Sequence, residues 1–227
     1  MELKGKVINF LGDSITFGVG VADIQNNRFD NIICREYELS KINNYGEGGT
    51  RIAHQRRPSP NPRFDLCFCG RAYKMSTSAD AVVVLGGVND YLHGDAYIGT
   101  PEDTTPETFC GAVNFLMDFL KVNYKEKGKP VVFMTPTRSC FRGDSDEKIS
   151  GYPCEKMPDA APLEKYVDII IDAGKRNAIP VLDLYRNLPI NPNIPEDRDK
   201  YTVDGLHLND EGHKLVAKML GEFLVEL

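Results

Sequence analysis

Two short motifs at opposite ends of the sequence carry residue types that could cooperate in nucleophilic catalysis. Gly12-Asp13-Ser14 follows an apolar run at residues 7–11, and Asp204-Gly205-Leu206-His207 lies near the C-terminus. A serine hydroxyl at the end of a strand is exposed, and neighbouring backbone N–H groups can stabilise negative charge. A carboxylate three residues before a histidine can reach one ring nitrogen and leave the other free as a base. Each motif alone also fits a helix cap or a turn.

Two glycine-containing motifs could supply hydrogen-bond donors to the same site. Residues 44–50 read Asn-Tyr-Gly-Glu-Gly-Gly-Thr, and residues 86–90 read Gly-Gly-Val-Asn-Asp. Glycine lets the backbone approach a ligand closely, and the Asn89 side chain could donate its amide N–H. A flexible turn and a capping asparagine are the alternatives. The sequence has no Gly-x-x-x-x-Gly-Lys motif, so a phosphate-binding P-loop is not supported.

The elements between these motifs predict how they are positioned. Short continuous apolar runs are typical of strands covered on both faces, and they occur at residues 7–11, 82–85, 131–134 and 179–184, with a weaker candidate at 42–45. Segments with helical periodicity alternate with them, at residues 31–39, 109–120 after a Thr105-Pro106 cap, 163–173 after Pro162, and 215–224 after a cap at Asn209 or Asp210. The alternation predicts an α/β fold, a three-layer α/β/α sandwich.

In such a sheet a ligand binds outside the carboxyl ends of the strands, where three of the four motifs begin. Residues 56–75 and 138–161 are predicted to be loops or insertions because they are rich in proline, glycine and polar residues. No linker or repeat divides the chain, so we expect one domain over residues 1–227.

Composition and charge exclude several classes of protein. Hydrophobic residues make up 41% and charged residues 26% of the 227 residues, which is ordinary globular usage. The net charge is −6, and nucleic-acid binding is not expected because there is no basic excess. The one basic cluster, Arg51 with Arg56 and Arg57, is interpreted as a solvated loop.

The sequence also indicates the cellular location of the protein and the chemical state of its cysteines. No apolar run is long enough to span a bilayer, and residues 1–11 lack a signal peptide's features, so we expect a cytoplasmic protein without a membrane span. The six cysteines do not suggest a disulfide framework. Cys67 and Cys69 lack further ligands at zinc-binding spacing, so we expect reduced, partly buried thiols and no metal.

Together, the four motifs resemble the blocks of the SGNH hydrolase superfamily, the GDSL-type esterases and lipases. They occur in the family's order and span nearly the whole chain, although the first block reads Gly-Asp-Ser-Ile rather than Gly-Asp-Ser-Leu. The resemblance implies Ser14 as nucleophile, His207 as general base and then acid, and Asp204 as the carboxylate that orients His207. It also implies an oxyanion hole formed by the Ser14 N–H, the Gly49 N–H and the Asn89 side chain, with Gly49 favoured over the adjacent Gly48 by alignment from Asn44.

The resemblance further implies a flavodoxin-like, five-stranded parallel sheet with a shallow, open site. We expect a two-step ester hydrolysis through an acyl-enzyme, with no metal or organic cofactor. Candidate substrate-binding residues are Asp13, for which a helix cap is the alternative, and four residues for which loop surface is the alternative: Tyr91, His93, Asp95 and Arg138. A polar lining favours a small acyl group, by preference acetyl, on a polar scaffold such as a sugar. His54 and His213 are interpreted as surface residues.

Other activities fit the same motifs. An acyltransferase, a lysophospholipase or a thioesterase could use the same triad. A non-catalytic module could instead bind an anion with Ser14, Gly48 and Gly49, leaving residues 204–207 as a simple turn. The expected partner in the enzymatic reading is a small-molecule acyl ester, and the oligomeric state cannot be read from the chain.

Overall fold

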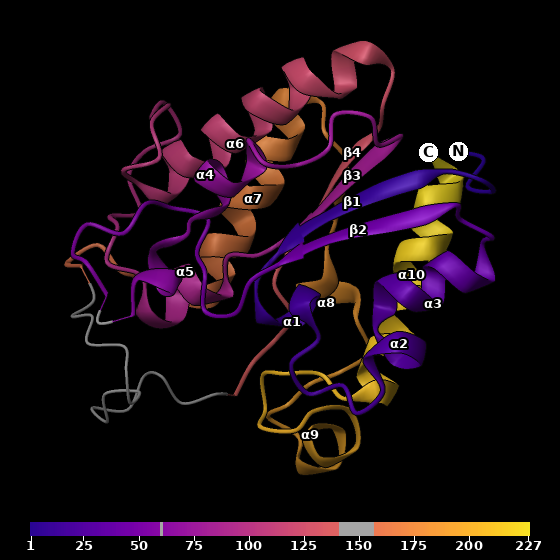
Figure 1. Cartoon of the computed structure of the whole chain (residues 1–227). Helices are drawn as coiled ribbons and strands as arrows, with labels where there is room; N and C mark the ends of the chain where they lie inside the picture. The colour runs from indigo at the N-terminus through magenta and orange to yellow at the C-terminus, as the bar shows by residue number, and fades with distance from the viewer. Residues whose placement is uncertain (60, 141–156) are drawn as a thin grey trace.

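A five-stranded parallel sheet runs through the molecule with strand order β2-β1-β3-β4-β5 (Figure 1). The computed structural model describes residues 1–59, 61–140 and 157–227. The strands are β1 Val7–Gly12, β2 Lys41–Gly46, β3 Ala81–Leu85, β4 Val131–Met134 and β5 Val181–Leu182. This order is the flavodoxin-like form of the doubly wound fold, as the sequence predicts.

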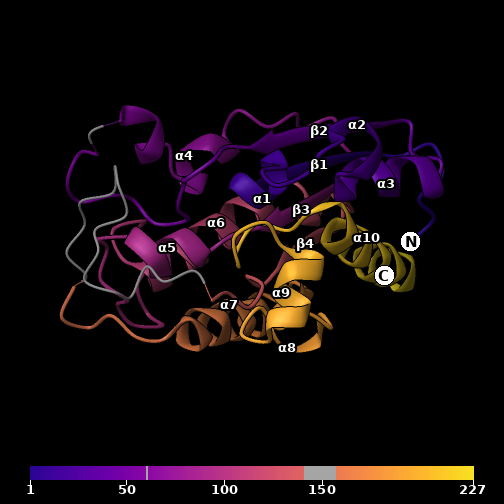
Figure 2. The same ribbon diagram turned by 90° about the horizontal axis from the view of Figure 1, so that it is seen from below.

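Helices cover both faces of the sheet and complete the predicted three-layer sandwich. Apolar side chains of α4, α6 and α7 pack on one face, and those of α1, α3, α8 and α10 pack on the other. Figure 2 shows the ribbons of α4 and α7 on one side of the sheet and those of α3 and α10 on the other. The helices are α1 Ser14–Phe17, α2 Ile24–Asn27, α3 Phe29–Glu36, α4 Phe68–Ala72, α5 Val88–His93, α6 Phe109–Asn123, α7 Leu163–Asn177, α8 Leu184–Asn187, α9 Pro195–Tyr201 and α10 Asp210–Glu226. Short 3-10 turns also occur in the described chain: η1 Pro62–Asp65 lies before α4, and η2 Lys125–Lys127 lies between α6 and β4.

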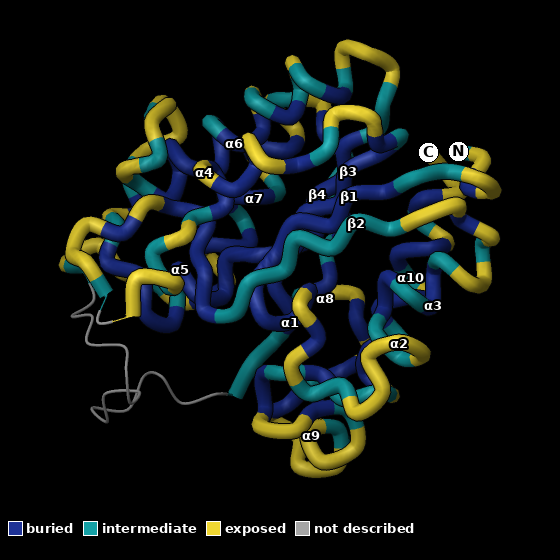
Figure 3. The backbone as a smooth tube through the Cα atoms, viewed as in Figure 1, coloured by how far each residue is buried: buried dark blue, intermediate teal, exposed yellow. Residues whose placement is uncertain are grey.

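The central position of β3 in the sheet explains why the sequence of this strand is continuously apolar. Val82 and Val84 contribute to the core under α6 and α7, whereas Val83 and Leu85 contribute to the core under α3 and α10. Both faces of the strand are therefore buried, which removes the alternation of apolar and polar residues found in half-exposed strands. Figure 3 shows the contrast with β2, an edge strand whose residues are mostly of intermediate exposure.

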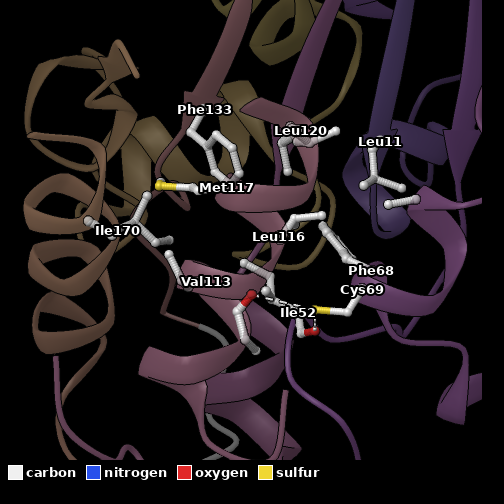
Figure 4. Packing of buried hydrophobic residues seen from close by; sticks show 14 of the residues in the cluster. Leu11, Ile52, Phe68, Cys69, Val113, Leu116, Met117, Leu120, Phe133 and Ile170 are labelled. Carbon is white, nitrogen blue, oxygen red and sulfur yellow. Dashed lines mark hydrogen bonds between the residues drawn. The ribbon is translucent and has the colours of Figure 1, made fainter. Parts of the chain in front are cut away.

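The segment between β2 and β3 is held in place by apolar packing of Ile52 and α4 against α6. Phe68, Cys69, Leu116 and Ile52 lie together in this cluster (Figure 4). The Cys69 Sγ lies 3.4 Å from the backbone carbonyl oxygens of both Ile52 and Ala112, and its single hydrogen can be donated to either. Burial raises the pKa of this thiol well above its ordinary value, so Cys69 is an inert structural thiol, and none of the cysteines that the structure describes forms a disulfide.

Several predicted boundaries differ from those observed. The helix expected after Thr105-Pro106 begins later, at Phe109, because the side chain of Thr108 accepts a hydrogen bond from the Gly111 N–H and caps it. The strand expected at 179–184 is reduced to β5, since Asp183 caps α8 and Leu184 is already helical. The helix expected at 31–39 is α3, which starts and ends earlier. Asn209 is the cap of α10, one of the two predicted alternatives.

The first predicted loop is partly wrong. Residues 56–75 contain η1 and α4, and α4 buries Phe68 and Cys69 against the core. Of the second predicted loop, residues 138–140 and 157–161 form no helix or strand, and 141–156 lie outside the described residues. Among the described segments, no helix is both long and apolar enough to cross a bilayer.

His213 is fully buried, so its assignment to the surface is wrong, whereas His54 is exposed as expected. The His213 ring stacks on Phe29, and its Nδ1 accepts a hydrogen bond from the Phe29 N–H at 3.2 Å. Burial, helped by the positive charge of Arg28, lowers the pKa of His213 to about 4. The folded state therefore holds the neutral ring, although Asp210 opposes the shift.

We expect His213→Leu to make the free energy of unfolding less dependent on pH. The stability contributed by a neutral imidazole with a lowered pKa is complete above about pH 6.5 and is lost as the pH falls through about 4. The stability difference between wild type and variant should narrow by up to about 3 kcal/mol between pH 7 and pH 4. Urea unfolding across this range measures the difference, with the exposed His54→Leu as control. A constant difference would contradict a buried neutral ring.

Candidate active site

The carboxyl ends of three adjacent strands bring the sequence motifs together. Ser14 is the first residue of α1 and lies just beyond β1, which pairs with β2 on one side and β3 on the other. Gly48 and Gly49 follow β2, and Asn89 lies in α5 after β3. In Figure 1, α1 and α5 lie beyond the same end of the strands. Ser14, Gly48, Gly49 and Asn89 line a common pocket.

His207 bridges Ser14 and Asp204 by hydrogen bonds. Its Nε2 lies 2.9 Å from the Ser14 Oγ, across 193 residues of sequence, and its Nδ1 lies 2.6 Å from the Asp204 Oδ2. A carboxylate can only accept, so the neutral ring carries its hydrogen on Nδ1 and presents the Nε2 lone pair to the serine hydroxyl. This arrangement suits transfer of the serine proton to His207.

Backbone hydrogen bonds hold the Asp204 carboxylate in place. Its Oδ1 accepts from the backbone N–H groups of Leu206 and His207, at 3.0 and 2.7 Å. Partial burial raises the pKa of Asp204, but the hydrogen bonds from the side chain and backbone of His207 outweigh burial and lower the pKa below its ordinary value. The carboxylate is therefore charged at neutral pH and can stabilise an imidazolium.

The local turn around Ser14 is fixed by its neighbours. The buried Asp13 caps α1 by accepting a hydrogen bond from the Ile15 N–H at 3.0 Å. A Cβ at Gly12 would lie 1.9 Å from the Thr16 Oγ1, so only glycine fits where the strand turns into the helix. Burial raises the pKa of Asp13 to about 6, against the lowering effects of the Ile15 N–H, His207 and Arg71.

The donors expected for an oxyanion line the pocket beside Ser14. Gly49 has a φ of 74°, in the left-handed region that glycine adopts without strain. The Asn89 Nδ2 donates one hydrogen to the Thr50 carbonyl at 2.9 Å and has a second hydrogen available. Ser14 is the first residue of its helix, so its N–H has no partner within that helix.

Arg71 is a structural residue of the site that sequence reasoning missed. Its guanidinium donates to the carbonyls of Gly12 (2.9 Å) and Tyr45 and to the Thr50 hydroxyl (2.8 Å). Arg71 therefore joins the ends of β1 and β2 to the loop that contains Thr50. The carbonyl of this same Thr50 accepts the hydrogen bond from Asn89. The only signal was a charged residue inside an apolar stretch, in a segment predicted to be a loop. Burial lowers the pKa of Arg71 to about 10, which leaves it charged.

Asp90 anchors the loop after Gly49 from the opposite side. Its two carboxylate oxygens accept hydrogen bonds from the Ile52 and Ala53 N–H groups, each at 2.9 Å. Burial raises the pKa of Asp90 to about 7, although these hydrogen bonds and Arg51 act to lower it. Arg51 itself is only 2% exposed, so the prediction that it belongs to a solvated basic loop is wrong.

The pocket has a volume of about 280 Å³ and is lined by apolar as well as polar side chains. It lies near the lower end of the range typical of small-molecule sites, about 300–1,000 Å³. Arg63 and Phe64, from η1, form part of its wall, and Arg63 pairs with Glu47 at 2.8 Å. The full lining is Ser14, Val19, Gly48, Gly49, Arg63, Phe64, Asn89, Leu92, His93, Leu206 and His207.

The candidate substrate-binding residues fall into two groups. His93 lines the pocket but is buried. Tyr91, which packs edge-on against Tyr166, and Arg138, which lies over the ring of Tyr185, are outside the lining that the described residues form. Asp95 is buried and accepts hydrogen bonds from the Arg56 and Arg57 N–H groups, so it anchors a loop.

No group of three or more acidic, histidine or cysteine side chains suited to a metal ion occurs within residues 1–59, 61–140 and 157–227. Ser14, His207 and Asp204 are side chains that could serve as nucleophile, base and orienting carboxylate.

Structural comparison places this architecture among known proteins. A Lactobacillus plantarum protein is 25% identical, with a TM-score of 0.79 and coverage of 98% of both chains. A possible lipase from Chitinophaga pinensis is 20% identical, with a TM-score of 0.67 and coverage of 97% of this chain and 98% of its own. An acetyl xylan esterase is 22% identical, with a TM-score of 0.63 and coverage of 96% and 98%. No match is found among curated proteins.

Sequence comparison with protein families agrees with the four motifs. Residues 10–215 match the GDSL-like lipase/acylhydrolase family, and this span contains all four blocks. The resemblance seen in the sequence is thereby confirmed. The chain belongs to the GDSL-like lipase/acylhydrolase family and is an ester-bond hydrolase.

Proposed function

We propose that the protein is a serine esterase that removes a small acyl group through an acyl-enzyme. The observation that carries the proposal is the contact of 2.9 Å between the Ser14 Oγ and the His207 Nε2, with Asp204 bound to the other ring nitrogen. The activity is assigned to one hydrolase domain formed by residues 1–227. Asp13 supports it by capping the helix that begins with Ser14.

In the first step, the Ser14 Oγ attacks the carbonyl carbon of the ester while His207 accepts the hydroxyl proton. Asp204 stabilises the imidazolium that forms. The oxyanion accepts hydrogen bonds from the N–H groups of Ser14 and Gly49 and from the Asn89 amide. The carbon–oxygen bond to the alcohol then breaks, and the alcohol leaves with the proton from His207.

In the second step, water attacks the acyl group bound to Ser14. His207 accepts one proton from this water and returns it to the Ser14 Oγ as the acyl–serine bond breaks, releasing the carboxylic acid. The residues carry out both steps by covalent catalysis at Ser14, proton transfer through His207 and electrostatic stabilisation of the oxyanion.

The volume of the pocket favours a small acyl group, by preference acetyl, and we expect the alcohol to be polar, such as a carbohydrate. A volume of about 280 Å³ leaves little room for a long acyl chain. Arg63 supplies a charged hydrogen-bonding group at the wall, where it could bind hydroxyl groups, and it is held there by its ion pair with Glu47. One structural relative is an acetyl xylan esterase, but at 22% identity that likeness concerns the fold.

Ser14→Ala or His207→Ala should lower kcat for p-nitrophenyl acetate by a factor on the order of 10⁴ to 10⁶, since each removes a member of the triad. A fluorophosphonate probe should label wild type at Ser14 and leave Ser14→Ala unlabelled. Ser78→Ala changes an exposed serine and serves as the control. Equal turnover by Ser14→Ala and wild type would reject Ser14 as the nucleophile.

Asn89→Ala should lower kcat by a factor on the order of 10² to 10³, because one oxyanion donor is lost. The effect should fall on kcat more than on KM, since the charge develops only in the transition state. Steady-state kinetics with p-nitrophenyl acetate measure both. An Asn89→Ala enzyme with unchanged kcat would remove Asn89 from the oxyanion hole.

The specificity constant kcat/KM should fall from p-nitrophenyl acetate to butyrate and fall further for octanoate, because the pocket has limited volume. Initial rates at matched concentrations below KM measure the trend, and a longer chain preferred over acetate would contradict the assigned acyl size. Competition between water and an added alcohol would show whether the acyl group is transferred instead.

A further inference from the structure

His93 lies one helical turn after the proposed oxyanion donor Asn89, on the same face of α5. The His93 Nε2 is 3.1 Å from the Asn89 Oδ1, and the His93 Nδ1 is 2.8 Å from the Arg51 Nη1. His93 and Asn89 are each 5% exposed or less, and Arg51 is 2% exposed. Three buried polar side chains therefore form a continuous chain that ends at the pocket.

The directions of these hydrogen bonds follow from the chemistry of the groups. A guanidinium can only donate, so Arg51 donates to the His93 Nδ1, which must be unprotonated. The neutral ring then carries its hydrogen on Nε2 and donates it to the Asn89 Oδ1. Burial, together with the positive charge of Arg51, lowers the pKa of His93 to about 3, in agreement with a neutral ring at the pH of an esterase assay.

The orientation of the Asn89 amide is fixed from both of its ends. The Nδ2 donates to the Thr50 carbonyl at 2.9 Å while the Oδ1 accepts from His93. An amide turned by 180° would place its NH₂ against the His93 Nε2–H and its oxygen against the Thr50 carbonyl. Both hydrogen bonds would become repulsive, and buried groups left unpaired cost about 1–3 kcal/mol each.

Arg51 is anchored in turn by the segment that forms the pocket wall. Its Nη2 donates to the Phe64 carbonyl at 2.7 Å and lies 3.4 Å from the Asp65 Oδ1. Phe64 itself lines the pocket. The chain of contacts thus runs from the pocket wall through Arg51 and His93 to the Asn89 amide.

We propose that Arg51 and His93 are positioning residues that aim the Asn89 Nδ2–H at the oxyanion. The proposal rests on the proposed function, since it acts through Asn89 as an oxyanion donor. Neither residue touches the reacting atoms. Their contribution is to hold the amide in the one orientation that presents a donor to the pocket before the substrate arrives.

A double-mutant cycle tests this relay. His93→Leu removes both hydrogen bonds and should lower kcat for p-nitrophenyl acetate on the order of 10-fold, a part of the 10² to 10³ that loss of an oxyanion donor costs. KM should stay within about twofold, because the interaction is made in the transition state. In the Asn89→Ala background, His93→Leu should change kcat by less than about twofold, since the residues act as a unit.

Two further variants separate positioning from a structural role. His93→Gln retains an acceptor and a donor on one side chain and should recover most of the kcat lost in His93→Leu. His213→Leu is the matched control, because it also removes a buried, neutral histidine but on the other face of the sheet. It should lower stability and leave kcat unchanged for the folded enzyme, which circular dichroism at the assay temperature verifies.

The tautomer of His93 gives a readout that does not depend on activity. Long-range ¹H–¹⁵N NMR spectra of the wild-type protein at pH 7 should show a neutral ring with its hydrogen on Nε2. A hydrogen on Nδ1, or a charged ring, would overturn the proposal even if His93→Leu fails to fold.

The kinetic outcomes distinguish the relay from the function on which it rests. Wild-type kcat in His93→Leu, or an equal loss in the presence and absence of the Asn89 side chain, would overturn the relay while leaving the esterase intact. Wild-type kcat in Asn89→Ala would instead remove the oxyanion assignment itself. A loss in His93→Leu that disappears in the Asn89→Ala background supports the relay.

Discussion

The positive charge of Arg71 is the constraint on which the geometry of the pocket depends. The Gly12 carbonyl at the end of β1 accepts a hydrogen bond from the Glu47 N–H and lies beside the turn that carries Ser14. Arg71 satisfies the carbonyls of Gly12 and Tyr45 and also holds the Thr50 hydroxyl. Because the Thr50 carbonyl is the acceptor for Asn89, a single guanidinium connects the strand that precedes Ser14 with the loop beside the Asn89 amide.

Buried charges around the pocket are tolerated because each is matched by fixed dipoles. Asp90 uses backbone N–H groups, and Arg51 uses a carbonyl and a neutral imidazole, in place of water. Such groups cost free energy to bury, and their role at the pocket is to fix its geometry rather than to add stability. The apolar core that includes Phe68 and Leu116 stabilises the fold, and the buried polar groups fix the geometry of the pocket.

The sequence predicted the parallel sheet and its order of motifs because buried strands and turn glycines leave local signals. Val82 and Val84 could be read as a strand without knowing their partners. Arg71 and Arg51 could not, because a charged residue near prolines and glycines resembles a solvated loop until tertiary contacts bury it. His213 was misassigned for the same reason: only its contact with Phe29, on a distant helix, removes it from solvent. The length of β5 also depended on a cap, Asp183, whose effect is not visible in hydrophobicity.

The separation of 193 residues between Ser14 and His207 has a consequence for how the enzyme matures. The proposed nucleophile, Ser14, is fixed by β1, whereas the proposed base, His207, lies in the turn that leads into α10, the last helix of the described chain. Contacts between such distant parts of a chain carry a loop-closure cost and are favoured only once the intervening elements have condensed. A folding intermediate with a complete sheet but an undocked last helix therefore contains a serine without its base. If Ser14 and His207 act as proposed, hydrolysis begins only when these two distant parts of the chain have met, and activity then reports on the completion of folding rather than on the formation of the sheet.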